Sequence, residues 1–147
     1  MDTNFFVLEF PSHSQNVGLA RLAAAILASE AGFSVEDLEE IKVAVSEAVT
    51  NAIVHGYEGR TNGVVRLEAR LAGNRLRLLV RDDGVGMADV ARALDPVPAG
   101  DADHVGLGFA FMRAFMDEVE VESSPGAGTS VHMEKVAQVG DLARDRQ

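Results

Sequence analysis

Residues 43–56 read VAVSEAVTNAIVHG, and both a fold and a candidate site can be predicted from them. Apolar residues recur at helical spacing, which predicts a helix that begins at Ser34 and ends near Gly56. Glu47 is the only acidic residue of the segment, which contains no Lys or Arg. Glu47 and Asn51 are four residues apart and therefore share one stripe of the helix, beside its apolar face.

The stripe has two interpretations. A carboxylate on a mostly buried helix costs free energy unless it is paired or used in chemistry. In the structural interpretation, Glu47 makes a satisfied contact with a neighbouring strand. In the functional one, Glu47 is a general base and the amide oxygen of Asn51 is a ligand for Mg²⁺. His55 continues the stripe and is expected to be structural, as a hydrogen-bonded residue at the helix end.

A second candidate is Asp82, at the end of a β-hairpin predicted over residues 65–82. Apolar residues alternate there with charged residues on both sides of a Gly-Asn turn. The alternation places Asp82 on the inward side, and Gly84 and Gly86 follow it. An inward carboxylate before a Gly-x-Gly loop suits recognition of a donor such as the amino group of adenine. The alternative is an aspartate that accepts local N–H groups in a turn.

Two further motifs lie near the C-terminus. Gly106 and Gly108 directly precede a short apolar helix expected from Phe109 to Met116. Glycines at a helix N-terminus let backbone N–H groups approach a phosphate, although an ordinary loop-to-helix junction has the same pattern. Thr129 begins the last predicted strand, where its hydroxyl either contacts a ligand or simply starts the strand.

Other classes of site are disfavoured. The sequence contains neither a Walker A pattern nor G-x-G-x-x-G, which disfavours P-loop and dinucleotide-binding folds. The four histidines lack metal-site spacing, which disfavours a zinc enzyme. There are no cysteines, which excludes disulfides. The net charge of −10 disfavours direct binding to nucleic acid but is compatible with a single nucleotide.

The whole chain predicts an α+β fold, in which a largely antiparallel sheet carries helices on one face. One domain is expected over residues 1–136, followed by a polar tail over residues 137–147. Residues 84–108 are expected to form a lid-like loop. The longest apolar run is too short to span a bilayer and no signal peptide is recognised, so a cytoplasmic protein is expected. The other expected elements are a strand over Asn4–Phe10 and a final hairpin around residues 123–128. A helix is also expected over Gln15–Ala31, capped by Ser12 or Ser14. Its side chains toward the core are expected to be Val17, Leu22, Ala25 and Ile26.

Together and in this order, the motifs resemble those of the GHKL ATPases, the superfamily that includes gyrase, histidine kinases and MutL. SEAVTNAIVHG resembles the N box, DDGVG the first glycine box, VGLGF the second, and GTS the closing threonine motif. The resemblance covers nearly the whole chain. It implies a Bergerat ATP-binding fold with ATP and Mg²⁺ as cofactors.

Within that superfamily the chain is too short for gyrase and lacks the phosphoacceptor helix of a histidine kinase. It is similar to the stand-alone anti-sigma serine kinases. VSEAVTNAIVHGYE and FMDEVEVESSPGAGTS most closely resemble the sporulation anti-sigma-F factors. The resemblance implies a homodimer that binds an RNA polymerase sigma factor and phosphorylates a serine of an anti-anti-sigma protein.

The resemblance also implies roles for individual residues. It implies that Glu47 is the base for the substrate serine and that Asn51 is the Mg²⁺ ligand. It implies that Asp82 and Thr129 contact adenine, in a pocket shaped by Gly84 and Gly86. It also implies that Gly106 and Gly108 contact the phosphates. One position departs from the family, because relatives often carry Arg-Ser where this chain has His104-Val105. A fixed cationic contact to the γ-phosphate is not expected here, since histidine is only partly charged near neutral pH.

Alternatives remain at this level. The chain is either a kinase, a module that sequesters a sigma factor with ATP as a conformational ligand, or a stand-alone histidine-kinase ATPase domain. Sequestration alone needs no base at Glu47. Phe5–Phe10 is a candidate dimer interface or an ordinary edge strand, and Arg21 is a candidate sigma contact or a solvated arginine. Either a sporulation or a stress-response sigma factor fits the resemblance.

Overall fold

The computed structural model describes residues 3–95 and 105–138. Its strands form one antiparallel sheet in the order β1-β2-β3-β5-β4. The strands are β1 (Thr3–Pro11), β2 (Val64–Ala72), β3 (Arg75–Asp82), β4 (Glu118–Ser123) and β5 (Thr129–Val136). The helices are α1 (Asn16–Ala28), α2 (Val35–Asn51), α3 (Val90–Ala93) and α4 (Val105–Phe115), with a 3-10 turn (Ser29–Ala31) after α1 and a π-turn (Ala52–Gly56) after α2.

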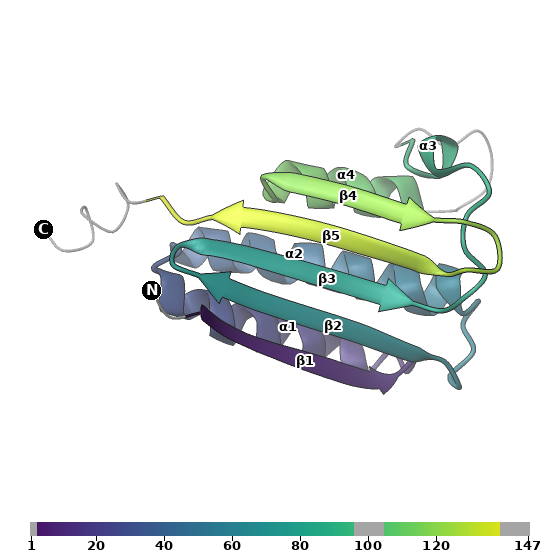
Figure 1. The fold of residues 1–147 in the computed structure, drawn as a ribbon, viewed down its shortest axis with the longest axis horizontal. Helices are drawn as coiled ribbons and strands as arrows, with labels where there is room; N and C mark the ends of the chain where they lie inside the picture. The colour runs from purple at the N-terminus through teal and green to yellow at the C-terminus, as the bar shows by residue number, and fades with distance from the viewer. Residues whose placement is uncertain (1–2, 96–104, 139–147) are drawn as a thin grey trace, which may run out of the picture.

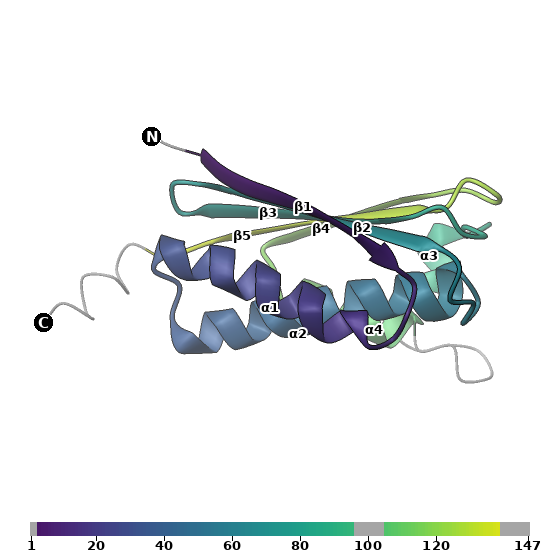
Figure 2. The same cartoon turned by 90° about the horizontal axis from the view of Figure 1, so that it is seen from below.

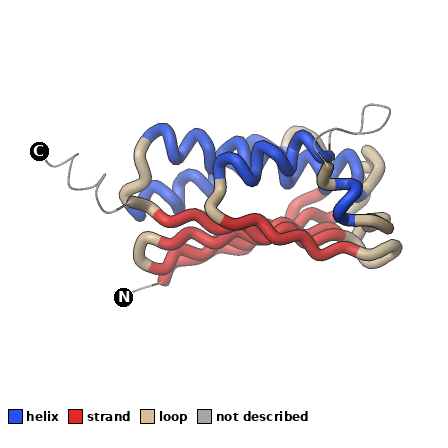
Figure 3. Tube along the Cα trace, turned by 90° about the horizontal axis from the view of Figure 1, so that it is seen from above, coloured by secondary structure: helices blue, strands red, loops and turns tan. Residues whose placement is uncertain are grey.

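The long helices α1, α2 and α4 all lie on one face of the sheet, as Figures 2 and 3 show. Helix α1 lies behind β1 and β2, α2 behind the centre of the sheet, and α4 behind β4 and β5 (Figure 1). The predicted α+β fold, with a largely antiparallel sheet and helices on one face, is confirmed.

The core lies between the sheet and the helices. In β2 and β3 every second side chain points into it, as the alternation predicts for a sheet with one covered face. Asp82 is the last inward position of β3 and is only 5% exposed. The buried apolar side chains of these strands are Val65, Leu67, Ala69, Leu71, Leu76, Leu78 and Val80.

Helix α1 packs mainly through small side chains, and Leu27 is its one large buried side chain. Ala25 is buried and Val17 is partly buried, as predicted. The predicted core positions Leu22 and Ile26 are wrong, because these side chains are 55% and 62% exposed. Alanines at a spacing of four occupy the buried face instead, which lets α1 approach its neighbours closely; they are Ala20, Ala24 and Ala28.

Helix α2 begins where the sequence predicts. Ser34 is its N-cap, and the Ser34 hydroxyl oxygen accepts a hydrogen bond from the N–H of Asp37 at 3.0 Å. Glu36 and Asp37 lie in the first turn, where negative charge stabilises the helix. At its other end the helix passes into the π-turn, which ends at Gly56.

The predicted serine caps of α1 are wrong. The N-cap position is Gln15, which makes no side-chain capping bond. Ser12 is fully buried and holds a loop together instead: its hydroxyl donates to the carbonyl of Arg60 and accepts from the N–H of Gly63. This loop connects α2 to β2, so Ser12 fixes one side of the site region.

Lys135 connects β5 to two helices. It is 8% exposed, and its Nζ donates to the carbonyl of Phe115 and to Glu40 at 3.3 Å. The contacts hold the C-terminal end of α4 and the N-terminal half of α2 against the sheet. Because a buried cation is tolerated only when paired, Lys135 fixes the relative position of the two helices.

The packed domain extends beyond residue 136, its predicted end. Ala137 is 1% exposed and exchanges hydrogen bonds with Asn74, so the packed domain includes it. Residues 139–147 of the predicted tail lie outside the described residues, as do residues 96–104 of the predicted lid, which include His104. Within the described ranges, no helix is both long enough and apolar enough to cross a bilayer.

Candidate functional site

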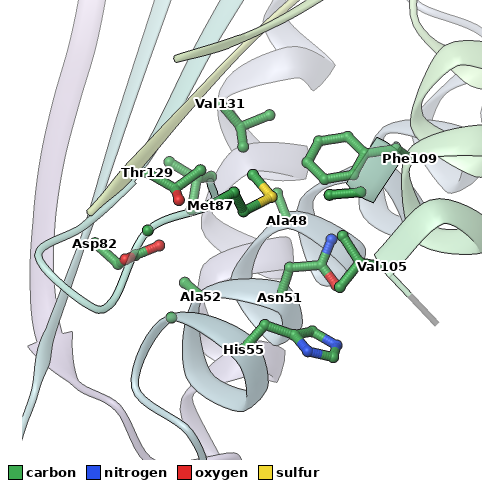
Figure 4. Close-up of a pocket in the computed structure, with 14 residues that line it drawn as sticks. Ala48, Asn51, Ala52, His55, Asp82, Met87, Val105, Phe109, Thr129 and Val131 are labelled. Atoms are coloured by element: carbon green, nitrogen blue, oxygen red, sulfur yellow. The ribbon is translucent and has the colours of Figure 1, made fainter. Parts of the chain in front are cut away.

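A cavity of about 200 Å³ lies between the sheet and the ends of α2 and α4. Figure 4 shows Asp82 and Thr129 at one end and Asn51 and Val105 toward the other. The predicted site residues Asn51, Asp82, Gly86 and Thr129 all line it. Its volume is below the ~300–1,000 Å³ of pockets for drug-sized ligands, so it suits a ring-sized part of a larger ligand. Most other lining side chains are apolar; they are Ala48, Ala52, Val80, Met87, Ala93, Val105, Phe109 and Val131.

The polar end is built by backbone packed tightly around Asp82. The N–H of Gly84 donates to Oδ1 of Asp82 at 2.9 Å. A Cβ placed on Gly56 would lie 2.7 Å from the Asp82 carboxylate, and one on Gly84 would lie 2.0 Å from the carbonyl oxygen of Gly56. Both positions therefore require glycine, and Gly84 is the first glycine of the Gly-x-Gly loop that follows Asp83.

Burial controls the charge of Asp82. Loss of solvent on burial raises the pKa of Asp82 to about 6. Hydrogen bonds from the N–H groups of Gly84 and Thr129 lower the pKa and so partly oppose this effect, and the negative charge of Asp83 raises it further. A carboxylate ionised at neutral pH but held in an apolar cavity is a strong hydrogen-bond acceptor. The predicted inward orientation of Asp82 is confirmed, and Asp82 is suited to bind a donor group.

The raised pKa predicts how stability depends on pH. An unfolded aspartate titrates near ~3.9, so between about pH 4 and pH 6 the folded protein holds a proton that the unfolded chain has released. The free energy of unfolding should therefore fall as pH rises through this window, relative to that of Asp82→Asn. Urea unfolding at several pH values measures the difference. Glu39→Gln is the control, because the Glu39 side chain is 65% exposed and does not contribute to the pKa shift of Asp82. If the free energies of unfolding of the wild type and Asp82→Asn differ by the same amount at every pH, the raised pKa of Asp82 is contradicted.

Glu47, Asn51 and Gly108 meet beside the cavity. A Cβ on Gly108 would lie 2.8 Å from Oε2 of Glu47 and 3.3 Å from Nδ2 of Asn51. Helix α4 thus approaches the Glu47–Asn51 stripe closely because position 108 lacks a side chain. Among the described residues, Nδ2 of Asn51 is the one buried side-chain nitrogen or oxygen without a hydrogen-bond partner. An orphaned donor beside a cavity fits an anionic ligand.

The second pair of glycines lies differently from the prediction. Helix α4 begins at Val105, so Gly106 and Gly108 are inside its first turn rather than in front of it, and both are buried. The first four N–H groups of a helix have no intrahelical partner and carry partial positive charge. The first four N–H groups of α4 therefore include those of Gly106 and Gly108. They lie beside the end of the cavity that Val105 lines.

Several residues of the site region carry no local signal. Tyr57 is buried; its hydroxyl accepts from the N–H of Asp83 at 2.8 Å and donates to the carbonyl of Val64. Burial raises the pKa of Tyr57, which keeps the hydroxyl neutral. Met87 and Phe109 line the cavity. Besides the predicted site residues, Gly56, as the predicted helix end, and the inward parity of the strands indicated positions near the cavity.

Comparisons with known proteins identify the family of the chain. The family model described as "Histidine kinase-like ATPase domain" matches residues 10–135. A protein of Thermoanaerobacter sp. (strain X514) named anti-sigma F factor is 43% identical over 135 residues, which cover 90% of this chain and 94% of the relative. The anti-sigma F factor of Clostridium novyi (strain NT) is 40% identical over 137 residues, which cover 92% and 96%.

Solved structures share the fold. The RsbU and RsbW domains of Rv1364c from Mycobacterium tuberculosis align with a TM-score of 0.66 at 20% identity, over 91% of this chain and 32% of that one. The catalytic domain of the histidine kinase ThkA aligns with a TM-score of 0.58 at 14% identity, over 96% and 99%. The chain therefore belongs to the GHKL-type histidine kinase-like ATPase domains, and its curated relatives in that family are anti-sigma F factors.

Proposed function

We propose that this chain is an anti-sigma factor and an ATP-dependent protein serine kinase. It binds and inhibits an RNA polymerase sigma factor, and it phosphorylates a serine of an anti-anti-sigma protein. The name of the curated relatives supports the first activity. The ATPase-type domain supports an ATP-dependent reaction.

One observation carries the kinase part of the proposal: Glu47 lies against Gly108 and next to Asn51, beside a cavity whose far end is polar. A serine hydroxyl must lose its proton when it attacks a phosphoryl group, whereas a neutral imidazole attacks through a free lone pair. A carboxylate at this place therefore favours a hydroxyl acceptor. In this proposal Glu47 accepts that proton.

The other residues bind and orient. Asn51 would hold Mg²⁺ through Oδ1, which is a hard oxygen ligand, and its orphaned Nδ2 would donate to a phosphate oxygen. Bound ATP would supply the phosphoryl group, and Mg²⁺ would neutralise its charge. Gly106 and Gly108 would present backbone N–H groups to the phosphates. Asp82 and Thr129 would contact the adenine, in the space shaped by Gly84 and Gly86.

A homodimer is part of the proposal. Strand β1 is an edge of the sheet, and its outward Phe5 and Val7 are 56% and 41% exposed. Helix α1 carries a second exposed apolar stripe made of Leu19, Leu22 and Ile26. Exposed apolar surface of this kind is typical of protein interfaces. Arg21 is exposed on the same helix, where it remains a candidate contact for the sigma factor.

The anti-sigma activity is tested by sedimentation and transcription. The chain is expected to sediment as a dimer and to form a heavier complex with one sigma factor of its organism when Mg²⁺ and ATP are present. The same sigma factor should lose its ability to direct transcription by core RNA polymerase. Glu47→Gln should inhibit equally well, because binding needs no base. Failure to bind or inhibit any sigma factor of the organism would contradict this half of the proposal.

A further inference from the structure

Ser123 is an inward residue at the end of β4, and it makes three hydrogen bonds at the polar end of the cavity. Its Oγ accepts from the N–H of Met87 at 2.8 Å and donates to the carbonyl of Gly128 at 3.0 Å. It also lies 2.8 Å from Oγ1 of Thr129. Met87 and Thr129 line the cavity, while Ser123 does not. Ser123 therefore acts behind the cavity wall.

One arrangement of protons makes all three contacts of Ser123 hydrogen bonds, although the Ser123–Thr129 distance alone allows either hydroxyl to donate. A serine hydroxyl has one proton and two lone pairs, and a carbonyl can only accept. The proton of Ser123 goes to Gly128, and one lone pair receives the N–H of Met87. The second lone pair is left for Thr129, so Thr129 is the donor in the hydroxyl pair.

In this arrangement Thr129 has no proton left for a ligand. Its Oγ1 faces the cavity as an acceptor only. Asp82, its register partner across β3 and β5, is also an acceptor when ionised. A ligand edge that carries N–H donors satisfies both groups, whereas a carbonyl oxygen at the same place would meet acceptors on both sides.

Ser123 also connects the two loops that enclose this end. Its bond to Met87 links the loop after β3 to the β4–β5 turn. The N–H of Gly126 donates to the carbonyl of Val85 at 2.8 Å between the same loops. A Cβ on Gly86 would lie 1.9 Å from the carbonyl oxygen of Ser124, so the loops are in direct contact. These contacts hold Ser123 in place from both loops.

We propose that Ser123 is a positioning residue that fixes the Thr129 hydroxyl as a hydrogen-bond acceptor. It thereby makes the cavity select a purine with an amino group at this edge over a purine with a carbonyl oxygen there. The inference rests on the proposed binding of ATP and adds a residue that governs base selectivity. Ser123 lies outside the base contacts that the motifs predict.

The test compares the dissociation constants of ATP and ITP, in which a carbonyl oxygen replaces the adenine amino group. Measurements at about pH 8 keep Asp82 ionised. The wild type should bind ATP more tightly than ITP. In Ser123→Ala the Thr129 hydroxyl is free to turn its proton toward a carbonyl, so the ITP-to-ATP ratio of dissociation constants should fall about five- to tenfold, as expected for one hydrogen bond.

Two further variants isolate the effect. Ser123→Thr keeps the hydroxyl and should keep the wild-type ratio. Thr129→Val removes the acceptor, leaves Ser123 in place and should lower the ITP-to-ATP ratio of dissociation constants. This variant tests the inference even if Ser123→Ala does not fold. A merely structural role for Ser123 would weaken ATP and ITP equally and leave the ratio unchanged, which would overturn the inference.

The wild type separates this inference from the proposed function. ATP binding without preference over ITP would overturn the inference and leave ATP binding intact. Binding of neither nucleotide would overturn the proposed function itself and the inference with it.

Discussion

Replacing Glu47 by glutamine is expected to lower phosphoryl transfer by about 10²–10⁴-fold, the range of general-base catalysis. Glutamine has nearly the same shape but cannot accept the proton of an attacking hydroxyl. Glu47 does not line the cavity, so the affinity for ATP should change by no more than about twofold. Initial rates of transfer from γ-labelled ATP and titration calorimetry measure the two effects separately.

Glu39→Gln is the matched control. Glu39 lies on the same helix, its side chain is 65% exposed, and it pairs only with Lys42 among the described ion pairs. The substitution removes the same charge away from the site, and exposed ion pairs contribute little. The control should retain wild-type rates. Transfer by Glu47→Gln within a few-fold of the wild type would show that Glu47 is not the base.

Gly128→Ala is expected to be strongly destabilising. Gly128 has φ +75°, and a Cβ there would lie 2.1 Å from the carbonyl oxygen of Asp82. Left-handed backbone costs a non-glycine residue roughly 1–2 kcal/mol, and relieving the clash requires β3 and β5 to separate next to Asp82. A total loss of about 3–5 kcal/mol is expected, together with weaker ATP binding.

Gly126→Ala separates the two contributions. Gly126 has φ +78°, but a Cβ there would have no atom within 4 Å. It should therefore lose only the backbone contribution of roughly 1–2 kcal/mol and keep ATP affinity. Urea unfolding of both variants measures the difference. Equal losses would show that close packing of Gly128 against Asp82 does not matter.

The sequence was sufficient for β3 and α2, where a local period determines the orientation of the side chains. Alternation along β3 predicted that Asp82 points inward, and the 3.6-residue period of α2 placed Glu47 beside Asn51. The same kind of reasoning was wrong for Leu22 and Ile26. Hydrophobicity alone favours large residues in the core, whereas the close approach of α1 selected alanines for that face.

What the sequence could not predict depends on contacts between distant segments. Tyr57 reaches Asp83 across 26 residues, and Ser123 reaches Met87 across 36. Neither residue interrupts a pattern, since Tyr57 follows a helix end and Ser123 opens a turn. The start of α4 was missed because glycine is a poor helix former, yet the absence of a Cβ at Gly108 is what lets α4 approach Glu47.

The most direct test of the central claim is to identify the residue that receives phosphate. The purified chain is incubated with Mg²⁺, γ-labelled ATP and the anti-anti-sigma protein of its organism, and the labelled protein is then treated with acid. We expect acid-stable label on one serine of that protein, and its loss in Glu47→Gln. Acid-labile label on a histidine, or no transfer despite saturable ATP binding, would contradict the assignment as a serine kinase.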